Sequence, residues 1–146
     1  MDDIDAKILR ELERDGRVTN LLLAERVGLS ASACLRRVQA LEAAGVIKGY
    51  RAVLDRAQLG AGMTVFVMVG LSGQLQRDAL AFERAMADAP EVLECHNITG
   101  SVEYLLRVEV ADLAAYKHYS DVLGTLGQVS SITSHVSLGS SKDLRA

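Results

Sequence analysis

Residues 20–41, NLLLAERVGLSASACLRRVQAL, carry the pattern that decides the fold of the first half of this chain. Asn20 is a good N-cap for a short helix that runs to about Val27, and the stretch Gly28-Leu29-Ser30 breaks that helix. Ser30 can cap a further helix, whose apolar residues recur at i, i+4 and i+7 as a buried stripe: Cys34, Val38 and Leu41. Two helices joined by a glycine-containing turn are typical of a helix-turn-helix, in which the second helix enters the DNA major groove.

A further helix is expected before this motif. Asp2 or Asp3 can cap it, and Gly16 is placed to end it. Its apolar residues recur at three- and four-residue spacing: Ile4, Ile8, Leu9 and Leu12. Gly45 is placed to close the helix that begins after Ser30. The sequence therefore predicts a three-helix DNA-binding domain over residues 1–48.

Residues 49–62 are expected to connect this domain to the rest of the chain. The stretch KGYRAVL, residues 48–54, is rich in strand formers and predicts a connecting strand. Gly60 and Gly62 then mark a linker. We place the domain boundary near residue 62.

Beyond this boundary the apolar pattern alternates between strands and helices. Residues 63–71, MTVFVMVGL, are apolar at every position except Thr64, as in a central strand buried on both faces. Residues 74–89 follow a helical period that Pro90 stops. The apolar side of this helix is Leu75, Ala79, Phe82, Met86 and Ala89.

The remaining segments complete a known supersecondary pattern. Two strand-like runs, residues 92–99 and 104–110, are close enough to form a hairpin. Asp112 caps a second helix, and residues 129–138 alternate as a last strand. The order βαββαβ predicts an α+β, ferredoxin-like domain over residues 63–146, with both helices on one side of an antiparallel sheet.

The other side of such a sheet is left without helices. Its apolar positions would form a costly exposed patch on a monomer. We therefore expect two chains to pack their sheets face to face. The resulting two-fold protein presents two recognition helices to half-sites about one helical turn, or multiples of one, apart.

The net charge of −3 is unevenly divided along the chain. Residues 1–62 carry 10 Lys and Arg against 9 Asp and Glu, which gives +1, whereas residues 63–146 carry 6 against 10, which gives −4. Positive charge is concentrated between Arg36 and Arg56. Because charges are screened beyond about 10 Å at moderate salt, an acidic total is compatible with a basic DNA-binding face.

Composition and motifs exclude several other classes of protein. With 49% hydrophobic and 24% charged residues, the chain is typical of a folded globular protein. Its longest apolar stretch is too short to span a bilayer, and Met1-Asp2-Asp3 is acidic where a secretory signal would be basic, so we expect a cytosolic protein. Cys34 and Cys95 lack metal-ligand spacing and are expected in the core or a strand.

Neither a metal nor a cofactor is expected. The three histidines fall on different predicted elements: His96, His118 and His135. The sequence also lacks a phosphate-binding GxxxxGK[ST] loop and a Ser/His/Asp order with supporting context.

Candidate DNA contacts lie at the start of the predicted recognition helix and off its buried stripe. Arg36 and Arg37 can reach phosphates or base edges there, although both can also be read as solvated helix charges. Ser30 serves first as a cap, and a helix N-terminus also favours phosphate. The full set of candidates is Ser30, Ser32, Ala33, Arg36, Arg37 and Gln39.

Several stretches resemble the Lrp/AsnC (feast/famine) transcriptional regulators along the whole chain. In the first half they are residues 4–9 (IDAKIL), 15–17 (DGR), 23–30 (LAERVGLS), 34–38 (CLRRV) and 41–47 (LEAAGVI). In the second half, residues 99–106, TGSVEYLL, resemble that family's threonine-glycine hairpin. The departures are Glu103, where the family commonly has Asp, and Leu21 and Leu22, where polar residues are more usual.

The resemblance implies a winged helix-turn-helix followed by a RAM/ACT-like ferredoxin domain. It also implies a regulator rather than an enzyme, and a homodimer that often assembles further into octamers or other rings of dimers. Double-stranded DNA is the implied partner. An amino acid or related metabolite is the implied effector, bound between subunits near the hairpin.

A zwitterionic effector needs donors for its carboxylate and an acceptor for its ammonium group. Backbone N–H groups around Gly100 and Ser101 can supply the donors, and Glu103 the acceptor. Without the resemblance, Gly100 is equally well read as a tight turn and Glu103 as a surface charge. A neighbouring chain can complete the site from its last strand. The full set of candidates is Thr99, Gly100, Ser101, Val102, Glu103, Tyr104, Thr133, Ser134 and His135.

Two alternative functions stay open at this point. Siroheme decarboxylases, which are enzymes with a tetrapyrrole substrate, are similar to this family in architecture. An architectural DNA-compacting protein without an effector is the other alternative.

Overall fold

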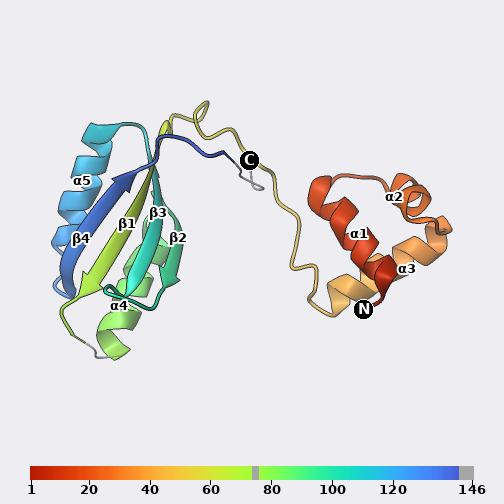
Figure 1. Ribbon diagram of the computed structural model, residues 1–146, viewed down its shortest axis with the longest axis horizontal. Coiled ribbons are helices and arrows are strands. Elements are labelled where there is room, and N and C mark those ends of the chain that lie inside the picture. Colours follow the sequence, from red (N-terminus) through yellow and green to blue (C-terminus); the bar gives the residue numbers. More distant parts are fainter. Residues whose placement is uncertain (74–75, 142–146) are drawn as a thin grey trace. The chain divides into compact units, whose positions relative to one another are not determined.

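The computed structural model describes residues 1–73 and 76–141. The chain divides into two compact units, Met1–Val53 and Leu54–Ala146 (Figure 1). Leu75, predicted on the buried side of a helix, lies outside the described residues. Within the part of the chain that the structure covers, no helix has the length and apolar character needed to cross a membrane.

The first unit consists of the helices α1 (Asp3–Arg14), α2 (Asn20–Val27) and α3 (Ala31–Ala43). Their apolar faces meet in one core, which confirms the predicted helix-turn-helix arrangement. The buried side chains of this core are Ile8, Leu23, Ala24, Val27, Cys34 and Leu41. Burial of each large aliphatic side chain contributes roughly 1.5–3 kcal/mol.

Polar caps fix where these helices begin. The Asp2 carboxylate accepts from the N–H groups of Ile4 and Asp5, and the Asp5 carboxylate accepts from the Asp2 N–H, which completes a capping box for α1. Ser30 caps α3, as predicted, by accepting from the Ala33 N–H. Gly28 ends α2 with φ +76°, a left-handed conformation that favours glycine.

The predicted cap of α2 is wrong by one residue. Thr19 is the N-cap, and its hydroxyl accepts from the Leu22 N–H at 3.3 Å. Asn20 is the first helical residue, and its amide instead donates to the Ala31 carbonyl at 2.8 Å. Both residue types can cap a helix, and the contact across the turn decides between them.

The strand predicted over residues 48–54 is also wrong, because none of this segment is in a strand. A strand needs a neighbouring strand to satisfy its backbone groups, and the described sheet consists of other segments. The Tyr50 hydroxyl instead donates to Glu42 Oε1 at 2.9 Å, which holds the segment against the end of α3.

The second unit has the predicted order βαββαβ. Its elements are β1 (Met63–Leu71), α4 (Gln76–Asp88), β2 (Val92–Asn97), β3 (Tyr104–Val110), α5 (Leu113–Gly124) and β4 (Val129–Val136). The strands pair in the order β2-β3-β1-β4, and every pair is antiparallel. Figure 1 shows α4 and α5 on the same side of this sheet. The α+β, ferredoxin-like fold is therefore confirmed.

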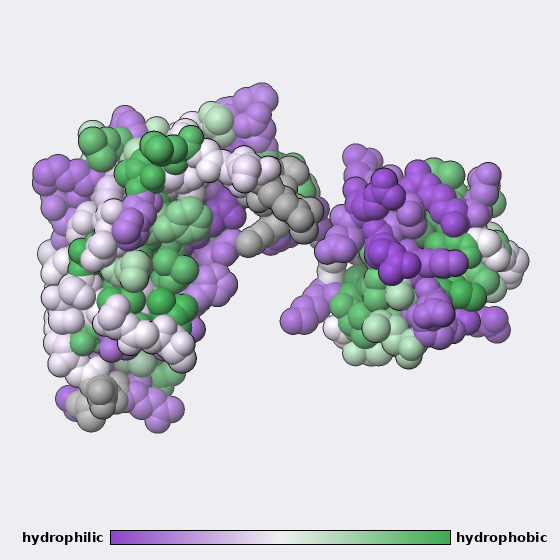
Figure 2. Space-filling model, viewed as in Figure 1, coloured by the Kyte–Doolittle hydropathy of each residue, from purple (hydrophilic) through white to green (hydrophobic). Residues whose placement is uncertain are grey.

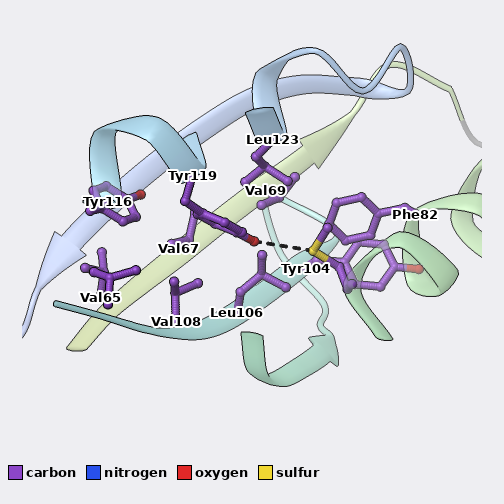
Figure 3. Close-up of a cluster of buried hydrophobic side chains, with 12 residues drawn as sticks. Val65, Val67, Val69, Phe82, Tyr104, Leu106, Val108, Tyr116, Tyr119 and Leu123 are labelled. Atoms are coloured by element: carbon purple, nitrogen blue, oxygen red, sulfur yellow. Dashed lines mark hydrogen bonds between the residues drawn. The ribbon is translucent and has the colours of Figure 1, made fainter. Parts of the chain in front are cut away.

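The core of this unit lies between the sheet and the two helices (Figure 3). Phe82 of α4 packs on Tyr104 of β3, with ring centroids 4.7 Å apart. The Tyr119 hydroxyl of α5 donates to Met86 Sδ at 3.6 Å, so the two helices also contact each other.

Strand β1 is buried on one face only, so the prediction of burial on both faces is wrong for the single chain. Val65, Val67 and Val69 are fully buried against the helices, whereas Phe66 between them is 40% exposed. The reason is that α4 and α5 cover the same face. We call the uncovered face the open face.

The open face is mixed in character rather than uniformly apolar. The β1–β3 register places Phe66 beside Arg107, and Met68 beside Leu105. Arg107 donates to Glu94 at 3.2 Å and to Glu109 at 2.7 Å. Figure 2 shows hydrophobic side chains interspersed with polar ones on the visible surface of this unit.

Candidate functional site

The outer surface of α3 is the candidate nucleic-acid interface. Cys34 and Leu41 are buried on its inner side. Exposed side chains recur at i, i+3, i+4 and i+7 on the outer side, which places them on one face of the helix. This stripe, the α3 stripe, consists of Ser32, Leu35, Arg36 and Gln39.

Arg36 projects from this stripe without an internal partner. Among the described residues, no carboxylate lies within ion-pair distance of it, and no side chain is hydrogen-bonded to it. Its guanidinium therefore keeps its full set of donors for an external anion.

Arg37 is placed differently, because it joins α3 to the first turn of α1. Its Nη1 donates to Asp2 Oδ2 at 2.8 Å and to Asp5 Oδ1 at 2.7 Å. The hydrogen bonds to Asp5 and Asp2 raise the pKa of Arg37. The pKa values of Asp2 and Asp5 are lowered, first by the backbone hydrogen bonds of the capping box and then by Arg37. The charge of Arg37 is therefore paired with two carboxylates of the same unit.

A similar ion pair joins α2 to α1. Arg26 Nη1 lies 3.0 Å from Glu11 Oε2. Its partner is fifteen residues away in the sequence, so spacing alone did not reveal it. Together with Arg37, this pair fixes both helices of the motif on α1.

The other predicted DNA contacts lie at the beginning of α3 or on its side. Ser30 Oγ is used as the cap and lies 3.3 Å from Ser32 Oγ. Ser32 and Gln39 are exposed, whereas Ala33 is half-buried. The structure thus brings Ser32, Arg36 and Gln39 onto one face and draws Arg37 away from it. Leu35, which was not among the predicted contacts, also lies on this face.

The second candidate site lies at the hairpin between β2 and β3. Asn97 pairs with Tyr104, and the Ile98 N–H donates to the Glu103 carbonyl at 2.9 Å. Between these pairs, Thr99, Gly100 and Ser101 are exposed, and Val102 is half-buried. Gly100 has φ +131°, which requires glycine.

Glu103 is fixed at the end of β1. Its Oε2 accepts from the Leu71 N–H at 2.8 Å. It lies over Gly70, where an added side chain would collide with Ser131 Oγ and approach Glu103. Glu103, Ser131 and the bare backbone at Gly70 therefore form a small polar corner beside the hairpin. A glycine within an otherwise apolar strand is the sequence signal that could have revealed it.

The predicted effector contacts on β4 are divided between the two faces of the sheet. Thr133 and His135 pair with Met68 and Phe66, so they lie on the open face. Ser134 lies on the opposite face, where its hydroxyl is hydrogen-bonded to the Tyr116 hydroxyl.

Thr133 and His135 are also unequally distant from the polar corner. Because a strand rises ~3.4 Å per residue, Thr133 is about 7 Å along β4 from Ser131 and His135 about 14 Å. A single amino acid cannot contact both Glu103 and His135 of one chain.

Tyr104 is a core residue rather than an exposed contact. Its side chain is 1% exposed, and its hydroxyl donates to Glu83 Oε1 at 2.8 Å. It borders a shallow cavity of ≈ 480 Å³ between α4 and β2. Cys95 also lines this cavity, and burial raises the pKa of its thiol.

Within residues 1–73 and 76–141, no cluster of three or more His, Cys, Asp or Glu side chains is arranged to hold a metal ion. The α3 stripe and the polar corner remain the candidate sites for DNA and for an effector.

A helix-turn-helix whose outer face carries an arginine without a partner among the described residues defines a DNA-binding protein, and the separate ferredoxin-like unit gives it a second domain. Residues 1–48 match the winged helix-turn-helix DNA-binding family, and residues 64–146 match the Lrp/AsnC ligand binding domain. The chain belongs to the Lrp/AsnC family of transcriptional regulators.

Named relatives agree with this assignment. The chain is 48% identical to the leucine-responsive regulatory protein of Rhizobium meliloti over 119 residues, which cover 82% of this chain and 76% of the relative. It is 47% identical to the Bkd operon transcriptional regulator of Pseudomonas aeruginosa, covering 82% and 78%. These relatives are named as regulators, so this chain is a regulator and not an enzyme, and the decarboxylase alternative is set aside.

A solved structure is similar over nearly the whole chain. It is a transcriptional regulator from Neisseria meningitidis in complex with L-Met, 35% identical, with a TM-score of 0.94. The match covers 98% of this chain and 93% of that one.

Proposed function

We propose that this regulator binds an amino acid at the polar corner beside the hairpin and changes its assembly or DNA affinity in response. The observation that carries this proposal is the position of Glu103, an acidic side chain held next to a turn with exposed backbone donors. The L-Met complex of the Neisseria meningitidis regulator supports an effector of this chemical class.

The chemistry of the corner suits a zwitterion. The N–H groups around Gly100 and Ser101 donate hydrogen bonds to the effector carboxylate, because a glycine turn lets the ligand approach the backbone closely. Oε2 of Glu103 is already bonded to the Leu71 N–H, so Oε1 is the atom that accepts from the ammonium group. We assign the effector side chain to the open face beside Thr133, which pairs with Met68.

We also propose that a second copy covers the open face. Phe66 is 40% exposed there, although it lies in a central strand. The Glu109 side chain on the same face is only 6% exposed, yet its Oε2 has no hydrogen-bond donor within the described residues. Arg56 Nε is 3.7 Å from that atom, an ion-pair distance but too long for a hydrogen bond.

A partner sheet packed on this face removes the apolar surface from water and brings donors to Glu109. Octamers or other rings of dimers are the expected higher assembly, and effector bound near the hairpin shifts the balance between them. An effector acts in this way only by binding one assembly more tightly than another.

On DNA, we assign different roles to the two neighbouring arginines. Arg36 contacts phosphate or a guanine edge, while Arg37 holds α3 on α1 through Asp2 and Asp5. Ser32 and Gln39 face the base edges, and Ser30 presents the N-terminus of α3 to the backbone. Because its target is the chromosome, the protein is expected to work in the cytoplasm.

A thermal-shift screen of the twenty amino acids at several protein concentrations tests the effector proposal. A specific ligand raises the melting temperature by mass action, by the equivalent of about 2.7 kcal/mol at a hundredfold excess over its dissociation constant. Glu103→Gln should abolish the shift, whereas His135→Ala should leave binding within one chain intact. A flat screen, with DNA binding retained, would favour an architectural protein without an effector.

A further inference from the structure

The α3 stripe contains one side chain that neither phosphate binding nor core packing explains. Leu35 is 46% exposed, and it is the large apolar side chain that α3 leaves in solvent. It is not packed in the core with its neighbour Cys34, which is fully buried.

Leu35 has polar neighbours on the outer side of the helix. Ser32 lies at i−3 and Gln39 at i+4, and Arg36 follows it directly. Its other two neighbours, Ala31 at i−4 and Val38 at i+3, are half-buried against the core. Leu35 is therefore bordered on its exposed side by groups that suit base edges and phosphates. An exposed leucine in this setting is stabilised when a complementary apolar group covers it.

The floor of the DNA major groove offers one such group. Each base pair presents hydrogen-bonding atoms there, and thymine alone adds a methyl group, at C5. Arg36 supplies the donors that suit guanine or phosphate, and Gln39 has the amide that suits adenine. The stripe lacks a matched contact for thymine unless Leu35 supplies it.

We propose that Leu35 reads a thymine methyl group in each half-site and so determines the sequence specificity of this regulator. Leu35 and Gln39 are four residues apart, which is about 6 Å along the helix axis. Since bases are stacked ~3.4 Å apart, the thymine lies within about two base pairs of the pair that Gln39 faces.

Replacing thymine by uracil tests this inference, because uracil lacks only the methyl group. The full-length protein first selects a duplex from a random pool. Each thymine of that duplex is then replaced by uracil in both half-sites, and the dissociation constant is measured by fluorescence anisotropy. We expect one position at which uracil weakens binding about fourfold per half-site, the equivalent of burying one methyl-sized group.

Variants of the protein test whether Leu35 is the side chain responsible for this loss of affinity. Leu35→Ala should bind the thymine duplex more weakly than the unchanged protein does, and replacing thymine by uracil should not weaken its binding further. Leu35→Met should still bind the uracil duplex more weakly than the thymine duplex, by a smaller factor. Leu21→Ala is the matched control, because Leu21 is 73% exposed but lies on α2. It should respond to uracil as the unchanged protein does. Circular dichroism verifies that each variant is folded.

Four results would overturn the inference. The first is a selected duplex in which no thymine position responds to uracil. The second is a uracil effect that persists in full in Leu35→Ala. The third is a changed oligomer mass for Leu35→Ala together with an unchanged response to uracil, which would identify Leu35 as a subunit contact. The fourth is a pool from which no sequence is enriched, which would contradict sequence-specific DNA binding and, with it, this inference.

Discussion

Arg37 Nη1 donates to Asp5 Oδ1 at 2.7 Å, and this hydrogen bond connects α3 to the capping box of α1. Its neighbour Arg36 has no such partner among the described residues. Two adjacent arginines that look equivalent in the sequence therefore have different surroundings, and we expect their variants to behave differently.

Arg36→Ala should weaken DNA binding and leave folding intact. Loss of one phosphate contact lowers the slope of log K against log salt by about 1. The melting temperature should stay near that of the unchanged protein, because Arg36 is exposed. Arg37→Ala should do the reverse, lowering the thermal stability of the helical unit with little change in the salt slope. Equal salt slopes for the unchanged protein and Arg36→Ala would show that Arg36 does not bind phosphate.

The pairs between Arg37 and its two carboxylates should make stability depend on acidic pH. Asp2 and Asp5 have pKa values below 3.8 in the folded state, so the unfolded chain binds protons more readily. Their stabilising contribution is complete well above pH 3.8 and is lost as pH falls through the folded pKa values. Melting temperatures followed by circular dichroism should thus differ between the unchanged protein and Arg37→Ala at pH 6, and this difference should shrink as pH falls below 3.8. A constant difference across this range would contradict the assignment.

Phe66→Asp should prevent the open faces from packing together. It places a charge in the apolar part of that face, where desolvating an unpaired carboxylate is costly. We expect a mass near 15.7 kDa by light scattering and weaker DNA binding, since half-sites are then bound singly. Leu80→Asp is the control, because Leu80 is 45% exposed but lies on α4. If both variants keep the mass of the unchanged protein, the open face is not the dimer contact.

Gly100→Ala should strain the hairpin. Its φ of +131° is unfavourable for a residue with a side chain, and such strain costs roughly 1–3 kcal/mol. We expect a lower melting temperature and loss of the effector-induced shift. Gly127→Ala serves as the control, because Gly127 does not have a positive φ and an added Cβ there would meet open space. If the effector still raises the melting temperature of Gly100→Ala, the hairpin is not part of the effector site.

Tyr104→Phe should separate a structural role from an effector role. The change removes the hydroxyl that donates to Glu83 and leaves the aromatic packing on Phe82 intact. Stability should fall by about 1 kcal/mol, the net value of a typical hydrogen bond. Effector binding in the thermal-shift assay should not change. A lost effector response at unchanged stability would instead identify Tyr104 as a contact.

Local signals in the sequence predicted most of the fold. Asp2 and Ser30 cap their helices as expected, and the apolar periods identified both helices and all four strands of the ferredoxin-like unit. The errors occurred where local signals were ambiguous or insufficient. Thr19 and Asn20 are both good caps, and residues 48–54 have strand-forming side chains but no strand beside them.

The candidate sites were harder to predict, because their decisive contacts join distant residues. The partners of Arg37 lie 35 and 32 residues earlier in the chain. The residues around Arg37 in the sequence therefore do not indicate that it turns away from the α3 stripe. Glu103 and Leu71 are likewise 32 residues apart. The alternation of β4 separated Thr133 from Ser134, but only the pairing with β1 shows which of them faces the helices.

Each of the two units closes its own hydrophobic core, one around Ile8 and Cys34 and the other around Val67 and Phe82. Each unit therefore buries its apolar side chains in a core of its own. Mutations that change which operator is bound and mutations that change which metabolite is bound can therefore accumulate independently during evolution. A chimera joined between Val53 and Leu54 should inherit its operator from one parent and its metabolite from the other.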